Sequence, residues 1–219
     1  MRLVICDVDG TLVDSQDDIC AAMGVAFESV GLDTPDRATI KGIVGLSLPE
    51  AMARLAPNRA VEHAALVEGY KAAYMSLRAE QGAAQSSPLF EGARDVLEAL
   101  RAEDETFLAV ATGKSRRGLD KLIAGHELEG YFHSEQVADN HPSKPHPSML
   151  EAALRETGCE AHQAVMVGDT TYDMDMARAA KVKPIGVSWG YHEAERLDAD
   201  ALVHSFAELP AAIDALLGE

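Results

Sequence analysis

The order of apolar and polar positions along the chain predicts short buried strands that alternate with amphipathic helices. Five apolar runs, the last two weaker, cover residues 3–6, 107–111, 164–167, 184–188 and 201–204. Short apolar runs that end in turn residues are typical of parallel strands buried on both faces. Between the strands, Ala93, Val96, Leu97 and Leu100 show the spacing of a helix with one apolar face. This alternation predicts a doubly wound α/β fold.

Capping residues predict where several helices begin and end. A helix over residues 147–157 is expected to stop at Gly158, because glycine favours the left-handed backbone of a helix C-terminus. Three other helices are expected to begin at polar N-terminal caps: Thr34 before Pro35, Ser47, and Ser205 in a capping box with Glu208.

One long segment breaks the alternation, because it contains only helical patterns. Apolar residues recur at helical spacing over residues 19–30, and residues 61–77 support a longer helix. A segment of this length is too long for an ordinary loop. We therefore expect a helical cap domain at 15–84, inserted into a core made of 1–14 and 85–219. Its two connections to the core would form a natural hinge.

Composition and charge exclude several classes of protein. The 219 residues are 47% hydrophobic, which is enough for a core and excludes overall disorder. The net charge of −17 would repel nucleic acid and anionic lipid, so neither nucleic acid nor a membrane is expected as a partner. Three scattered cysteines and the lack of a long apolar run fit a cytoplasmic protein. Whether it is a monomer or a homodimer stays open.

The first motif with chemical potential is Asp7-Val-Asp9-Gly-Thr, directly after the first expected strand. Two carboxylates two residues apart on an extended segment face the same side. They would lie at the carboxyl edge of the sheet, where such folds bind ligands. A capped turn is the alternative, since Asp and Gly are ordinary turn residues. However, Asp7 ends a buried strand, where an unpaired carboxylate is costly unless a cation or donors satisfy it.

A second acidic motif, Gly168-Asp169-Thr-Thr-Tyr-Asp173, follows the strand expected at 164–167. Its two carboxylates are one helical turn apart. Taken alone, Asp173 could simply interact favourably with the dipole of the helix that begins there. Together with Asp7 and Asp9, the motif supplies oxygen ligands from two strand ends, which suit Mg²⁺.

Four motifs, in order, resemble those of the haloacid dehalogenase-like superfamily: Asp7-x-Asp9-Gly-Thr, Thr112, Lys144 and Gly168-Asp169-x-x-x-Asp173. The resemblance spans nearly the whole chain. The expected helical insert looks like the small cap of the phosphoglycolate-phosphatase-like branch. The resemblance implies a Rossmann-like core of doubly wound parallel sheet, with an α-helical cap.

The resemblance also implies a role for each motif residue. Asp7 would be the nucleophile that forms an aspartyl-phosphate, and Asp9 the general acid and base. Thr112 and the backbone N–H of Gly113 would hold the phosphoryl oxygens, while Lys144 neutralises charge. The implied Mg²⁺ ligands are Asp7, the Asp9 carbonyl, Asp169 and, directly or through water, Asp173. Attack of a carboxylate on a phosphate dianion needs such cations to offset repulsion.

The presence of Asp9 favours phosphate-ester chemistry over dehalogenation within this family. The expected activity is Mg²⁺-dependent hydrolysis of a small phosphorylated metabolite, with phosphoglycolate as the first candidate. A sugar phosphomutase and an inorganic pyrophosphatase remain alternatives on the same fold. An inactive phosphate-binding module is a further alternative, although it would have no reason to keep the complete set of Asp7, Asp9, Lys144 and Asp169.

A second anionic group on the substrate would need a cationic partner from the cap. Arg37 and Lys41 are four residues apart and would share a helix face beside a glycine-containing turn. We expect at least one of them to bind the leaving group, the alternative being that both are solvated surface charges.

Three other patterns are weaker. Gly113-Lys114-Ser115 resembles the end of a phosphate-binding loop, but Leu108 stands where that loop needs glycine. The segment around Ser188 resembles a nucleophile elbow, but an acid and His204 would be crowded into too little chain. Irregular spacing argues against a zinc site formed by His133, His141 and His146.

Overall fold

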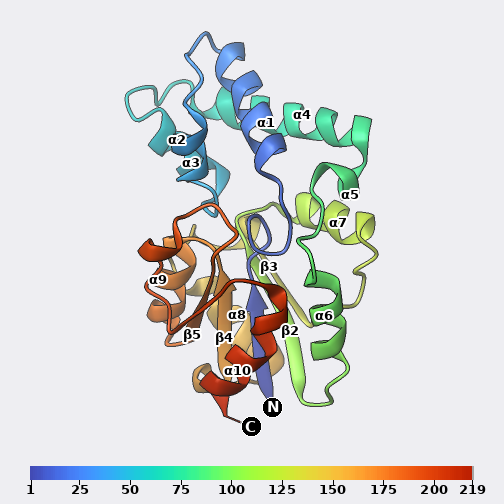
Figure 1. The fold of residues 1–219 in the computed structure, drawn as a ribbon. Helices are drawn as coiled ribbons and strands as arrows, with labels where there is room; N and C mark the ends of the chain where they lie inside the picture. The colour runs from blue at the N-terminus through green and yellow to red at the C-terminus, as the bar shows by residue number, and fades with distance from the viewer. Residues whose placement is uncertain (219) are drawn as a thin grey trace.

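The computed structural model describes residues 1–218, apart from the side chains of residues 80, 81 and 83, and this part of the chain forms one six-stranded parallel sheet (Figure 1). The strand order is β3-β2-β1-β4-β5-β6. The strands are β1 (Arg2–Cys6), β2 (Thr106–Thr112), β3 (Ser134–Val137), β4 (Ala164–Gly168), β5 (Lys183–Val187) and β6 (Ala201–Val203). The predicted α/β class is confirmed.

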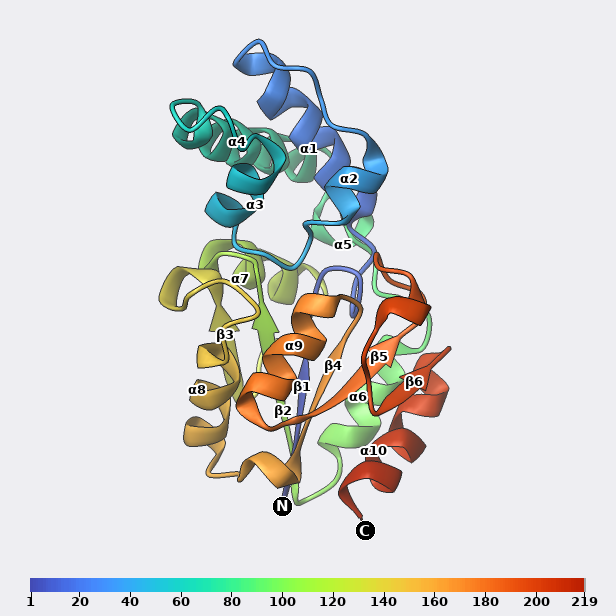
Figure 2. The same cartoon turned by 90° about the vertical axis from the view of Figure 1, so that its left-hand side faces the viewer.

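Helices cover both faces of the sheet, and Figure 2 shows α8 and α9 on one of them. Their bounds are α6 (Ala93–Arg101), α7 (Arg116–Gly125), α8 (Ser148–Thr157), α9 (Thr171–Ala180) and α10 (Leu209–Leu217). Side chains alternate along β1: Leu3 and Ile5 pack with α8 and α9, whereas Val4 and Cys6 pack with α6, α7 and α10. Both faces of the central strand are therefore buried. Within residues 1–218, no helix has both the length and the apolarity needed to cross a membrane.

The predicted strands are confirmed to within a few residues, but β3 was not predicted. It consists of Ser134, Glu135, Gln136 and Val137, and it pairs with β2 at the edge of the sheet. An edge strand with polar side chains lacks the apolar run that identifies a buried strand.

Two predicted helix caps are wrong. Asp36 rather than Thr34 caps α2, and its side chain accepts a hydrogen bond from the Thr39 N–H at 2.7 Å. A short 3₁₀ turn, Phe206–Glu208, precedes α10, so Ser205 does not cap that helix. Glu208 instead accepts from the backbone N–H of His204 at 2.9 Å. Ser47 does stand at the N-terminus of α3, but its side chain makes no capping hydrogen bond.

Five helices lie at the carboxyl edge of the sheet, and we call them the helical insert (Figure 1). They are α1 (Gln16–Ser29), α2 (Arg37–Lys41), α3 (Leu48–Leu55), α4 (His63–Gln81) and α5 (Ala83–Ser86). The insert has an apolar core in which Met23 and Phe27 of α1 are grouped with Met52 and Leu66, and Tyr191 joins this core from the sheet side. The helical content expected between the first two strands is therefore present.

The chain leaves the sheet for the helical insert and returns from it at one place. The Asp14 N–H donates to the Pro88 carbonyl at 2.9 Å, and Val13 forms an antiparallel bridge with Leu89. A side-chain hydrogen bond from Ser86 of α5 to Asp18 of α1 joins the two ends of the insert next to these connections. The two connections therefore lie side by side and are fixed to each other.

Candidate active site

Three buried carboxylates meet where the two central strands end. Asp7 follows β1, Asp169 follows β4, and Asp173 lies in the first turn of α9. Each offers one carboxylate oxygen, and these oxygens all lie within 4.8 Å of one another. None of the three residues is more than 1% exposed. The structure thus brings together the two acidic motifs, as the sequence predicts for the ends of parallel strands.

Lys144 is the cation at the centre of this cluster. Its Nζ lies 2.9 Å from Asp7 Oδ1 and donates a hydrogen bond to Asp173 Oδ1 at 2.7 Å. The residue is only 2% exposed. Burial disfavours its charge, but Asp173 and Asp7 outweigh that effect, so the pKa of Lys144 is raised and the side chain is positively charged.

Hydrogen bonds orient the other two carboxylates. Asp169 accepts from the Thr11 hydroxyl at 2.9 Å and from the Tyr191 N–H at 2.8 Å. Asp173 accepts from the Thr170 N–H at 3.1 Å and from the Thr170 hydroxyl at 2.7 Å. Neither Thr170 nor Tyr191 was predicted from the sequence as a site residue. The Thr170-x-x-Asp173 spacing of a capping box could have revealed the first, whereas no local signal points to the second.

The carboxylate of Asp7 is the least satisfied of the three. It forms the ion pair with Lys144, but its Oδ2 has no hydrogen-bond partner among the described groups of the chain. Burial raises the pKa of Asp7 to about 7; Lys144 opposes this shift, and repulsion from Asp173 adds to it. Burial likewise raises the pKa of Asp169.

These residues fit a divalent cation. Three carboxylates and one ammonium group leave two uncompensated negative charges when all are ionised, in a buried place where such charges are costly. Carboxylate oxygens are the ligands that Mg²⁺ prefers. Asp7, Asp169 and Asp173 are therefore the residues that would hold Mg²⁺.

Gly10 lets the loop after β1 come close to this cluster. Its φ is +84°, and a Cβ atom at this position would lie 2.3 Å from Asp169 Oδ2. Any other side chain would displace the carboxylate of Asp169.

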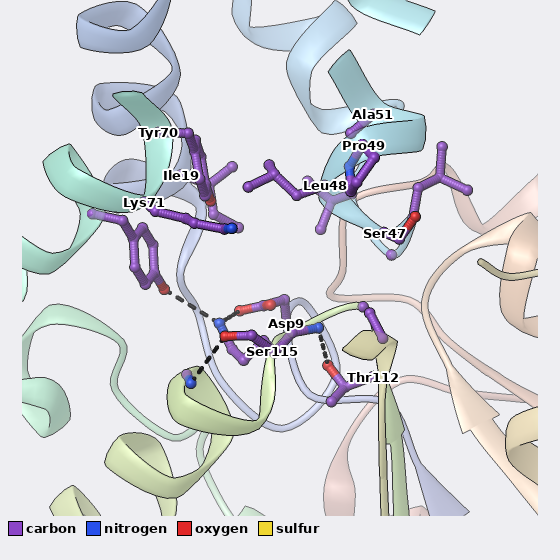
Figure 3. Close-up of a pocket in the computed structure, with 18 of the residues that line it drawn as sticks. Asp9, Ile19, Ser47, Leu48, Pro49, Ala51, Tyr70, Lys71, Thr112 and Ser115 are labelled. Atoms are coloured by element: carbon purple, nitrogen blue, oxygen red, sulfur yellow. Dashed lines mark hydrogen bonds and ion pairs between the residues drawn. The ribbon is translucent and has the colours of Figure 1, made fainter. Parts of the chain in front are cut away.

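The side chain of Asp9 has separate partners from those of the three carboxylates. It forms an ion pair with Lys114 Nζ at 2.8 Å and accepts a hydrogen bond from the Ser15 hydroxyl. The Thr112 hydroxyl accepts from the Lys114 N–H at 3.2 Å. Figure 3 shows Asp9 and Thr112 on the same side of the pocket.

A cavity of about 740 Å³ separates these residues from the helical insert. Asp7, Asp9, Thr112 and Gly113 line it from the sheet side. Figure 3 shows apolar and aromatic side chains opposite them, among them Ile19, Leu48 and Tyr70. The cavity therefore combines a polar floor with a largely apolar roof, as ligand sites commonly do.

The insert touches the sheet side through residues 42–47. The Ser47 N–H donates to the Ser143 hydroxyl at 2.8 Å, and the Tyr172 hydroxyl donates to the Gly42 carbonyl at 2.8 Å. A Cβ atom on Gly113 would lie 2.6 Å from the Leu46 carbonyl oxygen, a contact that real Cβ atoms essentially never make. Gly113 is thus required for this close approach.

Substitution Gly113→Ala should therefore loosen the contact while keeping the backbone N–H of residue 113. We expect faster hydrogen exchange in residues 42–47, measured by mass spectrometry, with the sheet strands unchanged. Gly118→Ala is the matched control, because a Cβ atom there has more space, its nearest neighbour being the Ser115 hydroxyl at 3.3 Å. Unchanged exchange in residues 42–47 would show that the contact tolerates a methyl group.

Arg37 and Lys41, which we expected to bind the leaving group, do not line the cavity. Arg37 forms an exposed ion pair with Asp17 at 2.6 Å. Lys41 Nζ lies 5.8 Å from the centre of the Tyr191 ring. Helical spacing correctly places both on α2, but it does not determine which way that short helix faces. The arrangement gives no support to a substrate contact from either.

Other basic residues line the cavity in their place. They are Lys71, Arg78, Lys114, Arg117 and Lys121. From the sequence, Lys114 was noted only as part of an incomplete phosphate-binding loop. Arg78 was not predicted, because a single arginine in a long helix carries no local signal.

The weaker sequence patterns do not form further sites. Ser188 Oγ lies 2.9 Å from His204 Nδ1, but in the described part of the chain no carboxylate contacts the other nitrogen of that ring. Among the side chains that the structure describes, the only group of His, Cys, Asp and Glu with metal-binding geometry is the aspartate cluster. His133, His141 and His146 are not part of it.

Comparison with known proteins agrees with this geometry. The model of a family described as "Haloacid dehalogenase-like hydrolase" matches residues 4–187. The "Probable phosphatase IndB" of Dickeya dadantii is 36% identical over 98% of this chain and 94% of its own. A "Phosphoglycolate phosphatase" of Chromobacterium violaceum is 33% identical over 95% of both chains. A solved haloacid dehalogenase-like hydrolase of Streptococcus pneumoniae superposes with a TM-score of 0.83 at 26% identity, covering 97% of this chain and 98% of that one.

Proposed function

The chain belongs to the haloacid dehalogenase-like hydrolase family, and on that premise we propose that it is an Mg²⁺-dependent phosphatase of small phosphate monoesters, with phosphoglycolate as its first candidate substrate. The observation that carries the proposal is the buried cluster of Asp7, Asp169 and Asp173 around Lys144. Relatives named as phosphatases and phosphoglycolate phosphatases support the reaction class.

In the first half of the reaction, Asp7 Oδ2 attacks phosphorus and the bond to the leaving oxygen breaks. Asp9 gives a proton to that oxygen, so an alcohol leaves and an aspartyl-phosphate remains. Thr112 and the N–H of Gly113 hold the phosphoryl oxygens, and Lys144 offsets their charge. Bound Mg²⁺ would supply charge neutralisation between the carboxylates and the phosphoryl group.

In the second half, Asp9 takes a proton from a water molecule that attacks the aspartyl-phosphate. Inorganic phosphate leaves and Asp7 is restored. The contact of Asp9 with Lys114 and Ser15 keeps its carboxylate at the cavity, away from the metal-binding oxygens.

We also propose that residues 15–84 act as a cap over a core of residues 1–14 and 85–219. Three features support this division: the apolar core of the insert, the paired connections and the cavity between the two parts. Closure would exclude water from the aspartyl-phosphate until the alcohol has left.

The test is release of inorganic phosphate from a panel containing phosphoglycolate, other small monoesters, hexose phosphates and pyrophosphate. We expect the highest kcat/KM for phosphoglycolate in Mg²⁺ and no turnover in excess chelator. Ca²⁺ should not restore activity, because it prefers more ligands at longer distances and would misplace Asp7.

Full activity in excess chelator would contradict the metal dependence. Interconversion of hexose phosphates without net phosphate release would indicate a phosphomutase, and exclusive cleavage of pyrophosphate would indicate a pyrophosphatase. Binding of phosphate esters with no turnover of any would indicate an inactive binding module.

A further inference from the structure

Arg78 on α4 is a buried cation with unused donors inside the cavity. It is 7% exposed and lines the same cavity as Asp7 and Asp9. Its Nε and Nη2 have no hydrogen-bond partner in the described part of the chain, which leaves out the side chains of residues 80, 81 and 83. Leaving buried donors unsatisfied is costly, and more so for a charged group.

A second cation stands beside Arg78. The guanidinium carbon of Arg78 and Nζ of Lys114 each lie 5.2 Å from the centre of the Tyr74 ring. Lys114 also donates a hydrogen bond to the Tyr74 hydroxyl at 3.3 Å. Burial and, to a lesser extent, the positive charge of Arg78 lower the pKa of Lys114, but its interactions with Asp9 and Tyr74 outweigh both and the net shift is upward. Both cations therefore lie against the Tyr74 ring.

The acidic groups nearby are already engaged. Asp9 forms its ion pair with Lys114, and Asp18 accepts a hydrogen bond from Ser86. Arg78 lowers the pKa of Asp18 through its charge, but burial dominates and raises it. In the described part of the chain, no carboxylate oxygen lies within 4.0 Å of the Arg78 guanidinium nitrogens. Asp18 therefore balances part of the positive charge of Arg78 without accepting a hydrogen bond from its Nε or Nη2.

We propose that Arg78 binds a carboxylate on the leaving group, so that the preferred substrates are short phosphate monoesters bearing a carboxylate. This assignment rests on the proposed phosphatase function. Nε and Nη2 form one edge of the guanidinium plane, and two parallel N–H donors match the two oxygens of a carboxylate. The aromatic face of Tyr74 holds the guanidinium plane by a cation–π contact.

The site also accounts for how a chain of net charge −17 accepts an anionic substrate. Lys144 is committed to Asp7 and Asp173, and Lys114 to Asp9. Arg78 remains as the buried cation in the cavity whose Nε and Nη2 have no partner among the groups that the structure describes. A local positive charge of this kind concentrates an anion despite repulsion from the rest of the surface.

Binding of two unreactive phosphonates, measured by calorimetry in Mg²⁺, tests the proposal without turnover. 3-Phosphonopropionate carries the carboxylate, and propylphosphonate has a methyl group in its place. We expect the wild type to bind the carboxylated compound about tenfold to a hundredfold more tightly, as a charged hydrogen-bond pair provides.

Arg78→Met should remove this preference while changing the Kd for propylphosphonate less than about threefold. Arg78→Lys should retain part of the preference, since it keeps the charge but loses the paired donors. Arg59→Met is the matched control: Arg59 is an exposed arginine of the helical insert, paired with Glu62 and outside the cavity, so the preference should stay unchanged.

Equal binding of both phosphonates by the wild type would overturn the proposal. A preference that survives Arg78→Met would also overturn it. An equal loss of affinity for both compounds in Arg78→Met would show that Arg78 has a structural role instead. If Arg78→Met fails to fold, Arg78→Lys provides the test. A full preference for 3-phosphonopropionate, in an Arg78→Lys variant that melts at the wild-type temperature, would contradict recognition by the paired donors of Arg78. Phosphate release from the substrate panel tests the phosphatase function separately.

Discussion

Substitution Asp7→Asn is expected to abolish turnover while leaving the protein folded. The amide keeps the shape of the carboxylate but lacks its negative charge and its nucleophilic oxygen. Loss of a nucleophile that no neighbour can replace should lower kcat by at least about 10⁴-fold. Asp169 and Asp173 do not line the cavity and have hydrogen bonds of their own, so we do not expect them to take over the attack.

The same substitution should not lower stability. Asp7 is ionised against burial and against the repulsion of Asp173, as its pKa of about 7 shows. Replacing it by a neutral group removes that repulsion, and Lys144 keeps its hydrogen bond to Asp173. We expect the melting temperature of the metal-free protein at pH 8 to stay the same or rise.

Phosphate release and differential scanning calorimetry on one preparation check both expectations. Mass spectrometry should exclude deamidation back to Asp. Asp95→Asn, on the exposed face of α6, is the matched control and should leave kcat and stability unchanged. Substantial turnover by verified Asp7→Asn protein would contradict a covalent mechanism through this residue.

Substitution Lys144→Met should strongly destabilise the metal-free protein. It removes the cation from between Asp7 and Asp173 and leaves buried carboxylates uncompensated. Breaking a buried ion pair by removing one partner costs about 3–5 kcal/mol. In a chain of this size, that corresponds to a fall in melting temperature of roughly 10 °C.

The destabilisation should depend on pH in a defined direction. A folded-state pKa of about 7 for Asp7, above its ordinary 3.8, means that the folded state binds its proton more tightly than the unfolded state. This favourable contribution is present at low pH and is lost as pH rises towards 7. Without Lys144 the pKa of Asp7 would rise further, so we expect a smaller loss at pH 5.5 than at pH 8.

Melting curves at both pH values, with and without Mg²⁺, provide the measurement. Mg²⁺ should recover part of the loss at pH 8, because a divalent cation would replace the missing charge. Lys121→Met removes an exposed lysine instead and should have little effect on stability. An equal loss at both pH values would show that packing, rather than charge, explains the role of Lys144.

The two buried aspartates at the strand ends were predictable from sequence, because local patterns determine their positions. Asp7 and Asp169 each follow a short apolar run, and parallel pairing of β1 with β4 brings such run ends together. Lys144 was recognisable only through the resemblance to a family. No spacing rule places it beside Asp173, which lies 29 residues further along the chain.

The cationic lining of the cavity was not predictable in this way. Asp9 meets Lys114 because β1 pairs with β2, but Arg78 and Lys114 meet the Tyr74 ring only because the helical insert rests on the sheet edge in one orientation. Helical periodicity defines the faces of α2 and α4, but not which face looks into the cavity. That orientation depends on long-range contacts such as those of residues 42–47 with Ser143 and Tyr172.

The paired connections at Asp14 and Pro88 have an evolutionary consequence. Because Val13 and Leu89 are already bridged, the contacts of the sheet do not depend on the length of the chain that runs between them. The entropic cost of a closed loop grows only slowly with its length, so this stretch can gain, lose or exchange whole helices with little penalty to the fold. Strand register, and with it the position of Asp7 against Asp169, stays the same throughout. Selection can therefore change substrate recognition by altering single helices of the insert, while the residues that cleave the phosphate ester stay in place.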